Sequence, residues 1–169
     1  YLYEYSTNQV SLPSASSWGY KGYNEVWMEG SNDWLYRHLH QAGRQMAHLA
    51  ENFASYIENR GTGIYKRALN QAAVELVLAQ ASDWPFIMKT GTMVAYAHRR
   101  SKCHLARFNR ICEDMANRTV DKKWLDEVAS RDNIFSDMDC AKYYMPHDAK
   151  PEDAPNKKSK TKKAKCVLS

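Results

Sequence analysis

The residues that most often carry catalysis or bind metal are present, but their spacing matches no common catalytic pattern. His38 and His40 fall on different faces of an expected helix, and His48 lies ten residues after His38. This spacing does not match H-E-x-x-H or a comparable zinc motif. The sequence also lacks a G-x-S-x-G elbow, a P-loop and a dinucleotide fingerprint. We therefore expect neither a metal site nor a cofactor in this chain.

Carboxylates do not form an obvious catalytic pair either. A glycosidase needs two of them facing one bond, one as the acid and one as the nucleophile or base. Glu25, Glu29 and Asp33 surround a glycine-rich stretch whose polar neighbours do not favour the protonated acid that this chemistry requires. Asp83 is the best single candidate for a catalytic acid, but one carboxylate cannot supply both roles. We expect this chain to be non-catalytic by itself.

Aromatic residues suited to binding are concentrated near the start of the chain. Three of the five tryptophans lie within residues 16–36, a stretch that three glycines interrupt and that follows no period of 2 or 3.6. This pattern predicts an ordered aromatic loop rather than a helix or a strand. Trp and Tyr have flat faces and a polar edge, which suit stacking on a sugar ring, a base or a partner protein. The same rings would also serve to fill the gap between the loop and the domain.

A second cluster of polar and aromatic residues lies at 82–92. Pro85 disfavours helical geometry at Trp84, so we predict a break between two helices here. Residues at such a break can aim side chains into a cleft. The local alternative is that Asp83 and a threonine cap helices while Trp84 fills the core.

Helical periodicity dominates the rest of the chain and predicts an all-α fold, a bundle of three to four main helices preceded by the aromatic loop. Ser31 or Asn32 is expected to cap the first helix, which ends near Gly61. A basic outer face on the third long helix, residues 92–117, is expected to be solvated. The other expected segments are a helix at 64–81, a short helix at 121–131 and an irregular closing segment at 132–144.

Several motifs in a fixed order resemble a known domain. They are Ser16-Ser17-Trp18-Gly19, Val26-Trp27, Asn32-Asp33-Trp34, Ala68–Ala73 and Gln80–Phe86. Together they resemble the C-terminal helical domain of the glucan branching enzymes of glycoside hydrolase family 57. The resemblance covers roughly Asn8 to Asn109.

This resemblance implies a division of labour with a catalytic domain. In these retaining enzymes the catalytic Glu and Asp belong to an incomplete β/α barrel that precedes the helical domain, and the helical domain helps to wall the active-site groove. By motif match, Trp18 and Trp27 are expected to hold the α-glucan and Asp83 to make a polar contact with it. Trp84 and Thr92 are further expected contacts. An upstream barrel of the same polypeptide is thus an expected partner.

The resemblance also suggests domain boundaries and a rival activity. Residues 1–15 are expected to be a connector from the barrel, residues 16–145 the helical domain and residues 146–169 a disordered basic tail. The rival is another activity of the same family, a 4-α-glucanotransferase or an amylase.

The tail carries most of the net charge of +5. Six of the 24 Lys and Arg residues lie within 156–169, which leaves 18 basic and 19 acidic residues elsewhere. A nucleic-acid partner is therefore not expected. Cys166 begins a C-a-a-X sequence after the basic run, which resembles the prenylated ends of Ras-type small GTPases. A membrane is a partner only if Cys166 is prenylated, and a non-catalytic helical module tethered in this way is a second rival. The four cysteines show no tight pairing, which fits a reduced, cytoplasmic setting.

Overall fold

The computed structural model describes residues 11–53 and 63–140. This part of the chain is helical and contains no strand, which confirms the predicted all-α class. Its elements are the 3-10 helix η1 (Tyr20–Gly22) and the helices α1 (Trp34–Asn52), α3 (Ile64–Ala79), α4 (Asp83–Thr90), α5 (Val94–Ala116) and α6 (Lys122–Arg131). None of these helices has the length and hydropathy of a membrane span. The tail with Cys166 lies outside the described residues.

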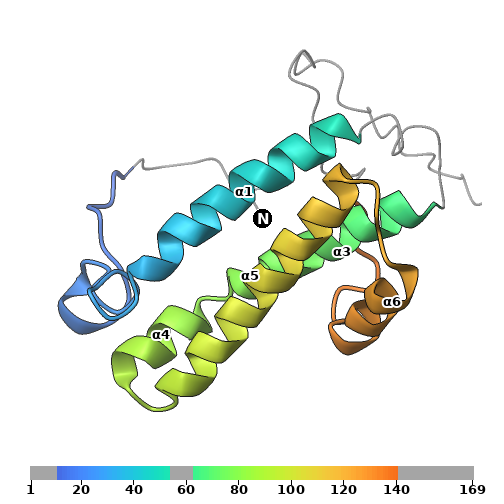
Figure 1. The fold of residues 1–169 in the computed structure, drawn as a ribbon. Coiled ribbons are helices and arrows are strands. Elements are labelled where there is room, and N and C mark those ends of the chain that lie inside the picture. The colour runs from blue at the N-terminus through green and yellow to red at the C-terminus, as the bar shows by residue number, and fades with distance from the viewer. Residues whose placement is uncertain (1–10, 54–62, 141–169) are drawn as a thin grey trace, which may run out of the picture.

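The core lies where three long helices meet. α3 and α5 pack along one another, and α1 contacts both (Figure 1). α1 buries apolar residues spaced by threes and fours, which is the pattern expected of an amphipathic helix, and these residues are Leu35, Leu39, Ala42 and Leu49. The fully buried large apolar side chains of the core are Leu35, Leu69, Phe108, Ile111, Met115 and Leu125.

The shorter elements occupy opposite ends of the bundle. Residues 16–33, which we call the aromatic loop, lie beside α4 at one end, and α6 lies at the other end (Figure 1). α4 packs on α5, and α6 packs on α3. α6 starts one residue after the predicted 121, and the Asp121 carboxylate caps it by accepting hydrogen bonds from the backbone N–H groups of Lys123 and Trp124.

The start of α1 differs from the prediction. Asp33 occupies the N-cap position and its side chain makes no capping hydrogen bond. Asn32 does not cap the helix, because its side chain is fully buried between the aromatic loop and α4. Within the described residues, α1 ends at Asn52. The predicted end of this helix near Gly61 lies outside them.

The predicted break at residues 82–92 is instead the helix α4. Pro85 is the third residue of this helix, in the first turn, where backbone N–H groups have no intrahelical partner to lose. Gly91 ends the helix in the left-handed conformation, with a φ of 78°. Two apolar residues of the long helices, Val77 and Val94, are nevertheless exposed by 40% and 36%.

Candidate functional site

Three aromatic rings from two segments form an exposed cluster at the loop end of the bundle. The Trp18 ring lies 5.9 Å from that of Trp27 at an interplanar angle of 55°, and 6.0 Å from that of Phe86 at 39°. Trp18 is 71% exposed, whereas Trp27 and Phe86 are partly buried. The structure thus brings together the two tryptophans that the sequence predicted, with Trp18 open to a ligand. We call these three residues the aromatic cluster.

Local hydrogen bonds hold the loop around Trp18 in a compact shape. The Ser17 backbone N–H donates to the Gly22 carbonyl oxygen at 2.7 Å, and the Ser17 hydroxyl oxygen accepts from the Asn24 N–H at 2.6 Å. Gly19 has a φ of 101°, and a Cβ atom at this position would lie 2.5 Å from a methyl group of Val26. Glycine is therefore required next to Trp18 both for the backbone conformation and for the close approach to Val26.

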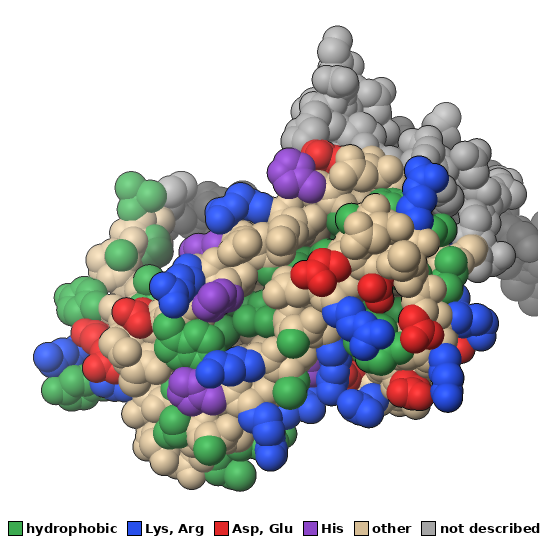
Figure 2. All heavy atoms as spheres, in the orientation of Figure 1, with side chains coloured by type: hydrophobic (Ala, Val, Ile, Leu, Met, Phe, Trp, Pro, Cys, Tyr) green, Lys and Arg blue, Asp and Glu red, His purple; other side chains and the backbone are tan. Residues whose placement is uncertain are grey.

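The surroundings of the cluster are also rich in exposed apolar surface. Tyr20, Tyr23 and Met28 are exposed by 69%, 74% and 64% on the same loop. Figure 2 shows hydrophobic side chains at the end of the molecule that this loop forms. Exposed aromatic side chains gathered on one loop are typical of a binding surface rather than of a core.

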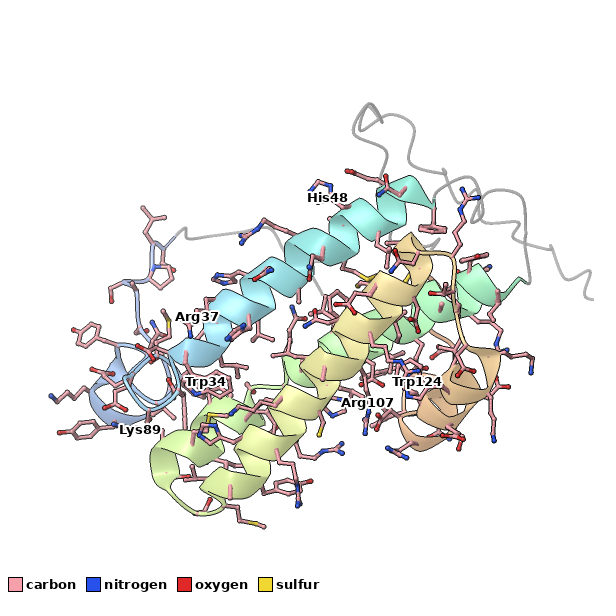
Figure 3. The ribbon with its side chains drawn as sticks, viewed as in Figure 1. Trp34, Arg37, His48, Lys89, Arg107 and Trp124 are labelled. Atoms are coloured by element: carbon pink, nitrogen blue, oxygen red, sulfur yellow. The ribbon has the colours of Figure 1, made fainter. Side chains whose placement is uncertain are left out.

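A buried amide and an ion pair join the loop to α4. The Asn32 side chain donates to the carbonyl oxygens of Val26 and Pro85. On the surface, Lys89 lies 3.2 Å from the Glu29 carboxylate (Figure 3). The hydrogen bond from the Ser31 hydroxyl, followed by that from Lys89, lowers the pKa of Glu29.

The other predicted site residues lie along α4 and just beyond it. Asp83 begins the helix and is exposed, one turn before Phe86, so their side chains are neighbours on its surface. Trp84 is turned inward: its indole N–H donates to the Leu78 carbonyl oxygen at 2.8 Å, and its ring meets Tyr96 edge-on at 6.1 Å. Thr92 lies two residues after the last residue of α4. Of these three residues, Asp83 is the one that helical spacing places next to a ring of the aromatic cluster, three residues before Phe86.

A second group of functional side chains lies inside the bundle. Glu75 and His104 are both fully buried, and His104 Nδ1 lies 2.8 Å from the Glu75 carboxylate. Arg107 donates to the carboxylate of Asp132, which is 5% exposed, and lies 3.9 Å from Glu75. Arg100 approaches Asp132 at 4.0 Å. We call Glu75, His104, Arg107 and Asp132 the buried charge network.

Part of this network resembles a metal-binding group in its spacing. One ligand atom from each of Glu75, His104 and Asp132 lies within 4.8 Å of the others. Arg107, however, already supplies positive charge to both carboxylates. A divalent cation would face this guanidinium at close range, so the arrangement fits a structural ion-pair network better than a metal site.

The expectation that the basic face of α5 is solvated holds for Arg99, Lys102 and Arg110, which are exposed, and is wrong for Arg107. Arg107 is only 15% exposed and lies on the side of α5 that faces α6 (Figure 3). A sequence signal for this network existed. Glu75 falls three residues after Ala72 and four before Ala79, so the apolar stripe of α3 contains an acid, and His104 falls in the stripe of α5. An acid and a histidine on two facing stripes predict a buried pair.

Comparison with known proteins places this helical domain in a family. Residues 38–143 match the family described as 1,4-alpha-glucan branching enzyme, C-terminal. The chain belongs to this family. This member of the branching-enzyme C-terminal family is 30% identical over 141 residues to the 1,4-alpha-glucan branching enzyme of Thermococcus kodakarensis. The match spans 80% of this chain and 20% of that enzyme.

Solved structures agree with this membership. A branching enzyme of glycoside hydrolase family 57 from Thermococcus kodakaraensis, crystallised with glucose, matches with a TM-score of 0.73 and 30% identity over 85% of this chain. The corresponding enzyme of Pyrococcus horikoshii matches with a TM-score of 0.68 and 32% identity over 83%. The alpha-amylase AmyC of Thermotoga maritima matches with a TM-score of 0.56 and 37% identity over 65%. These matches cover 26%, 26% and 20% of the three solved chains, so this branching-enzyme domain spans about a quarter or less of its relatives.

Proposed function

We propose that this chain is the glucan-binding helical domain of an α-1,4-glucan branching enzyme, which transfers an α-1,4-glucan segment to form an α-1,6 branch. The observation that carries the proposal is the aromatic cluster, an exposed tryptophan backed by two further rings on a domain of this family. A sugar ring has an apolar face that stacks on such a surface while its hydroxyls stay in water. The Thermococcus relative was crystallised with glucose, which supports a carbohydrate ligand.

In this proposal the catalytic carboxylates belong to a barrel domain upstream in the same polypeptide. The barrel forms a covalent glycosyl-enzyme by a retaining mechanism, with one carboxylate as nucleophile and the other as acid and then base. The intermediate must then react with a glucan hydroxyl instead of water. A surface that holds the acceptor chain and excludes water favours transfer over hydrolysis.

The predicted contacts contribute to different degrees in this proposal. Trp18 supplies the stacking face and Trp27 supports it from behind. The exposed Asp83 carboxylate, one turn from Phe86, accepts hydrogen bonds from sugar hydroxyls. Trp84 uses its N–H within the protein, so it acts by holding α4 on α3 rather than by polar contact with glucan.

The test compares Trp18→Ala with Ile134→Ala in the complete polypeptide. Both residues are 71% exposed, but Ile134 lies in the segment after α6, at the other end of the molecule. Loss of one stacking face is worth about 1.4 kcal/mol, or roughly tenfold, so Trp18→Ala should lower the rate of α-1,6 linkage formation about tenfold. Donor cleavage, measured as released reducing ends, should fall less.

The control variant Ile134→Ala should retain both rates. A branching rate in Trp18→Ala equal to that of the unchanged enzyme would remove the acceptor-binding role from the aromatic cluster.

A second candidate activity is favoured by the likeness to the Thermotoga amylase, which shows the highest identity of the three structures compared, at 37%. An amylase or a 4-α-glucanotransferase would use the same aromatic cluster on a linear α-glucan. Linkage analysis of the products separates these activities, because only the branching enzyme generates new α-1,6 bonds. A product containing α-1,4 bonds alone would assign the chain to this second group.

We also infer a cytoplasmic location, since three described cysteines are free thiols. Fractionation of cells that carry the unchanged protein or its Cys166→Ser variant tests this inference. Recovery of both proteins in the soluble fraction supports it. Recovery of only the variant there would favour tethering through a prenylated tail.

A further inference from the structure

The side chain of Asn32 joins the two segments that build the aromatic cluster. It is fully buried, and both polar atoms of its amide have partners. The amide oxygen accepts from the Glu29 backbone N–H at 2.9 Å, while the amide nitrogen donates to the carbonyl oxygens of Val26 at 3.0 Å and Pro85 at 3.1 Å. One planar group therefore links a turn of the aromatic loop to a helix that lies 53 residues later in the chain.

On the loop side, this amide fixes the residue on which Trp18 depends. Val26 is 7% exposed, its carbonyl oxygen binds Asn32, and its side chain lies against Gly19 without room for a Cβ atom. Gly19 follows Trp18 directly, and Trp27 follows Val26 directly. The position of Asn32 thus sets the backbone next to both tryptophans.

On the helix side, the amide fixes the residue next to the third ring. Pro85 is buried, and its carbonyl oxygen accepts the second N–H of Asn32. Phe86 follows Pro85 and lies 6.0 Å from Trp18. Trp27 and Phe86 each follow directly after a residue whose carbonyl oxygen binds Asn32. Trp18 is linked indirectly, because the neighbouring Gly19 packs against the side chain of Val26.

We infer that Asn32 is a positioning residue that holds Trp18, Trp27 and Phe86 together as one surface. Only an amide of this length offers one acceptor and two donors in the arrangement found here: aspartate has no donor, and glutamine is one methylene longer. A buried carbonyl oxygen left without a donor costs far more than an exposed hydrogen bond contributes. That the surface binds α-glucan rests on the function proposed above.

The other polar link between the same segments serves as a matched control. Glu29 and Lys89 are 43% and 34% exposed, and exposed ion pairs contribute little because water and salt screen them. Lys89→Ala removes this link without touching Asn32 or the rings. If any polar contact between loop and helix sufficed, the two links would be equivalent.

The experiment compares Asn32→Asp, Lys89→Ala and Trp18→Ala in the complete polypeptide. Asn32→Asp keeps the shape of the side chain but replaces the donor to two carbonyl oxygens by an acceptor. Near-ultraviolet circular dichroism reports the coupling of the Trp18 and Trp27 rings, and affinity electrophoresis in amylose reports glucan binding. Far-ultraviolet circular dichroism verifies that the helices are intact.

We expect Asn32→Asp to lose the tryptophan coupling and to bind amylose about tenfold more weakly, as Trp18→Ala does. Lys89→Ala should retain both properties. Asn32→Asp with unchanged coupling overturns the inference, whether or not it binds amylose. If the coupling is lost but neither Asn32→Asp nor Trp18→Ala weakens binding, positioning by Asn32 stands and the proposed glucan surface is wrong.

A second variant decides the matter if Asn32→Asp does not fold. Gly19→Ala forces a Cβ atom against Val26 and leaves the helices untouched. It should displace Trp18 from Trp27 and abolish the same coupling. Retention of the coupling in Gly19→Ala would show that the Val26 junction does not position the rings, and would overturn the inference.

Discussion

Glu75 is the residue whose loss the fold should tolerate least. Its fully buried carboxylate accepts a hydrogen bond from Gln71 at 3.0 Å, lies 2.8 Å from His104 Nδ1 and faces Arg107. We expect Glu75→Ala to lower the free energy of unfolding by about 3 to 5 kcal/mol, since it leaves buried donors and a guanidinium without their partner. Urea unfolding followed by circular dichroism measures this change.

The surface pair of Lys122 and Asp126 provides the comparison. Lys122 is 71% exposed, so Lys122→Ala should leave the urea midpoint nearly unchanged. A Glu75→Ala variant as stable as Lys122→Ala would show that the buried charge network is not structural.

Cys140 should react slowly in the folded protein. Burial, followed by the neighbouring Asp139 carboxylate, raises the pKa of its thiol to about 11, and the thiol lies 3.7 Å from the Leu69 carbonyl oxygen. The reactive thiolate is therefore about a hundredfold scarcer than for an ordinary thiol at pH 8. We expect iodoacetamide to label Cys140 about a hundredfold more slowly in the native protein than in urea, with the rate rising as the pH approaches 11. Equal rates in both states, read by peptide mass spectrometry, would contradict this burial.

At the scale of elements, two aspartates at helix starts should behave differently. Asp121 caps α6 through two backbone N–H groups, whereas Asp33 makes no side-chain capping bond at the start of α1. Asp121→Ala should lower the free energy of unfolding by about 1 kcal/mol. Asp33→Ala should leave it unchanged. Thermal unfolding of the two variants side by side provides the measurement, and a larger loss in Asp33→Ala would reverse the assignment.

The sequence predicts helices well where a single apolar face packs on the core. The long helix α1 and the short helix α6 are predicted from their apolar residues, because burial there follows a period of 3.6. α4 was missed because a proline in the first turn looks locally like a break, although it removes no hydrogen bond at that position. The sequence predicts a helix cap at Asn32 because asparagine favours that role locally, whereas one of its observed partners, the Pro85 carbonyl oxygen, is 53 residues away.

At the scale of the whole molecule, binding and catalysis should be separable. In the described part of the chain, the two carboxylates that lie close together, Glu75 and Asp132, are buried and paired with Arg107. We therefore expect the purified 169-residue chain to bind amylose but to release no reducing ends and form no branches. Measurable turnover by this chain alone would contradict the expectation that its carboxylates form no catalytic pair.

The candidate site was partly predictable at this scale. The resemblance to the family predicts Trp18 and Trp27 as contacts by motif match, and the structure brings the two rings together. Phe86 joined them only in three dimensions, because the packing of α4 against the loop decides which ring reaches Trp18. Trp84, its near neighbour in sequence, points the other way on the same helix. The spacing of residues along a helix predicts which of them share a face. Which residues that face then contacts depends on how the helices and loops pack.

The partner of Arg107 has a consequence for how the domain is made. Asp132 lies 25 residues after Arg107, beyond α6. During translation, α3 and α5 emerge from the ribosome before Asp132 does. Until Asp132 is made, the Arg107 guanidinium between these helices faces the Glu75 carboxylate alone. The buried charge network is therefore completed only by Asp132, near the end of the described chain. A truncation just before Asp132 should therefore lower the stability of the domain, because it leaves the partly buried Arg107 without this carboxylate.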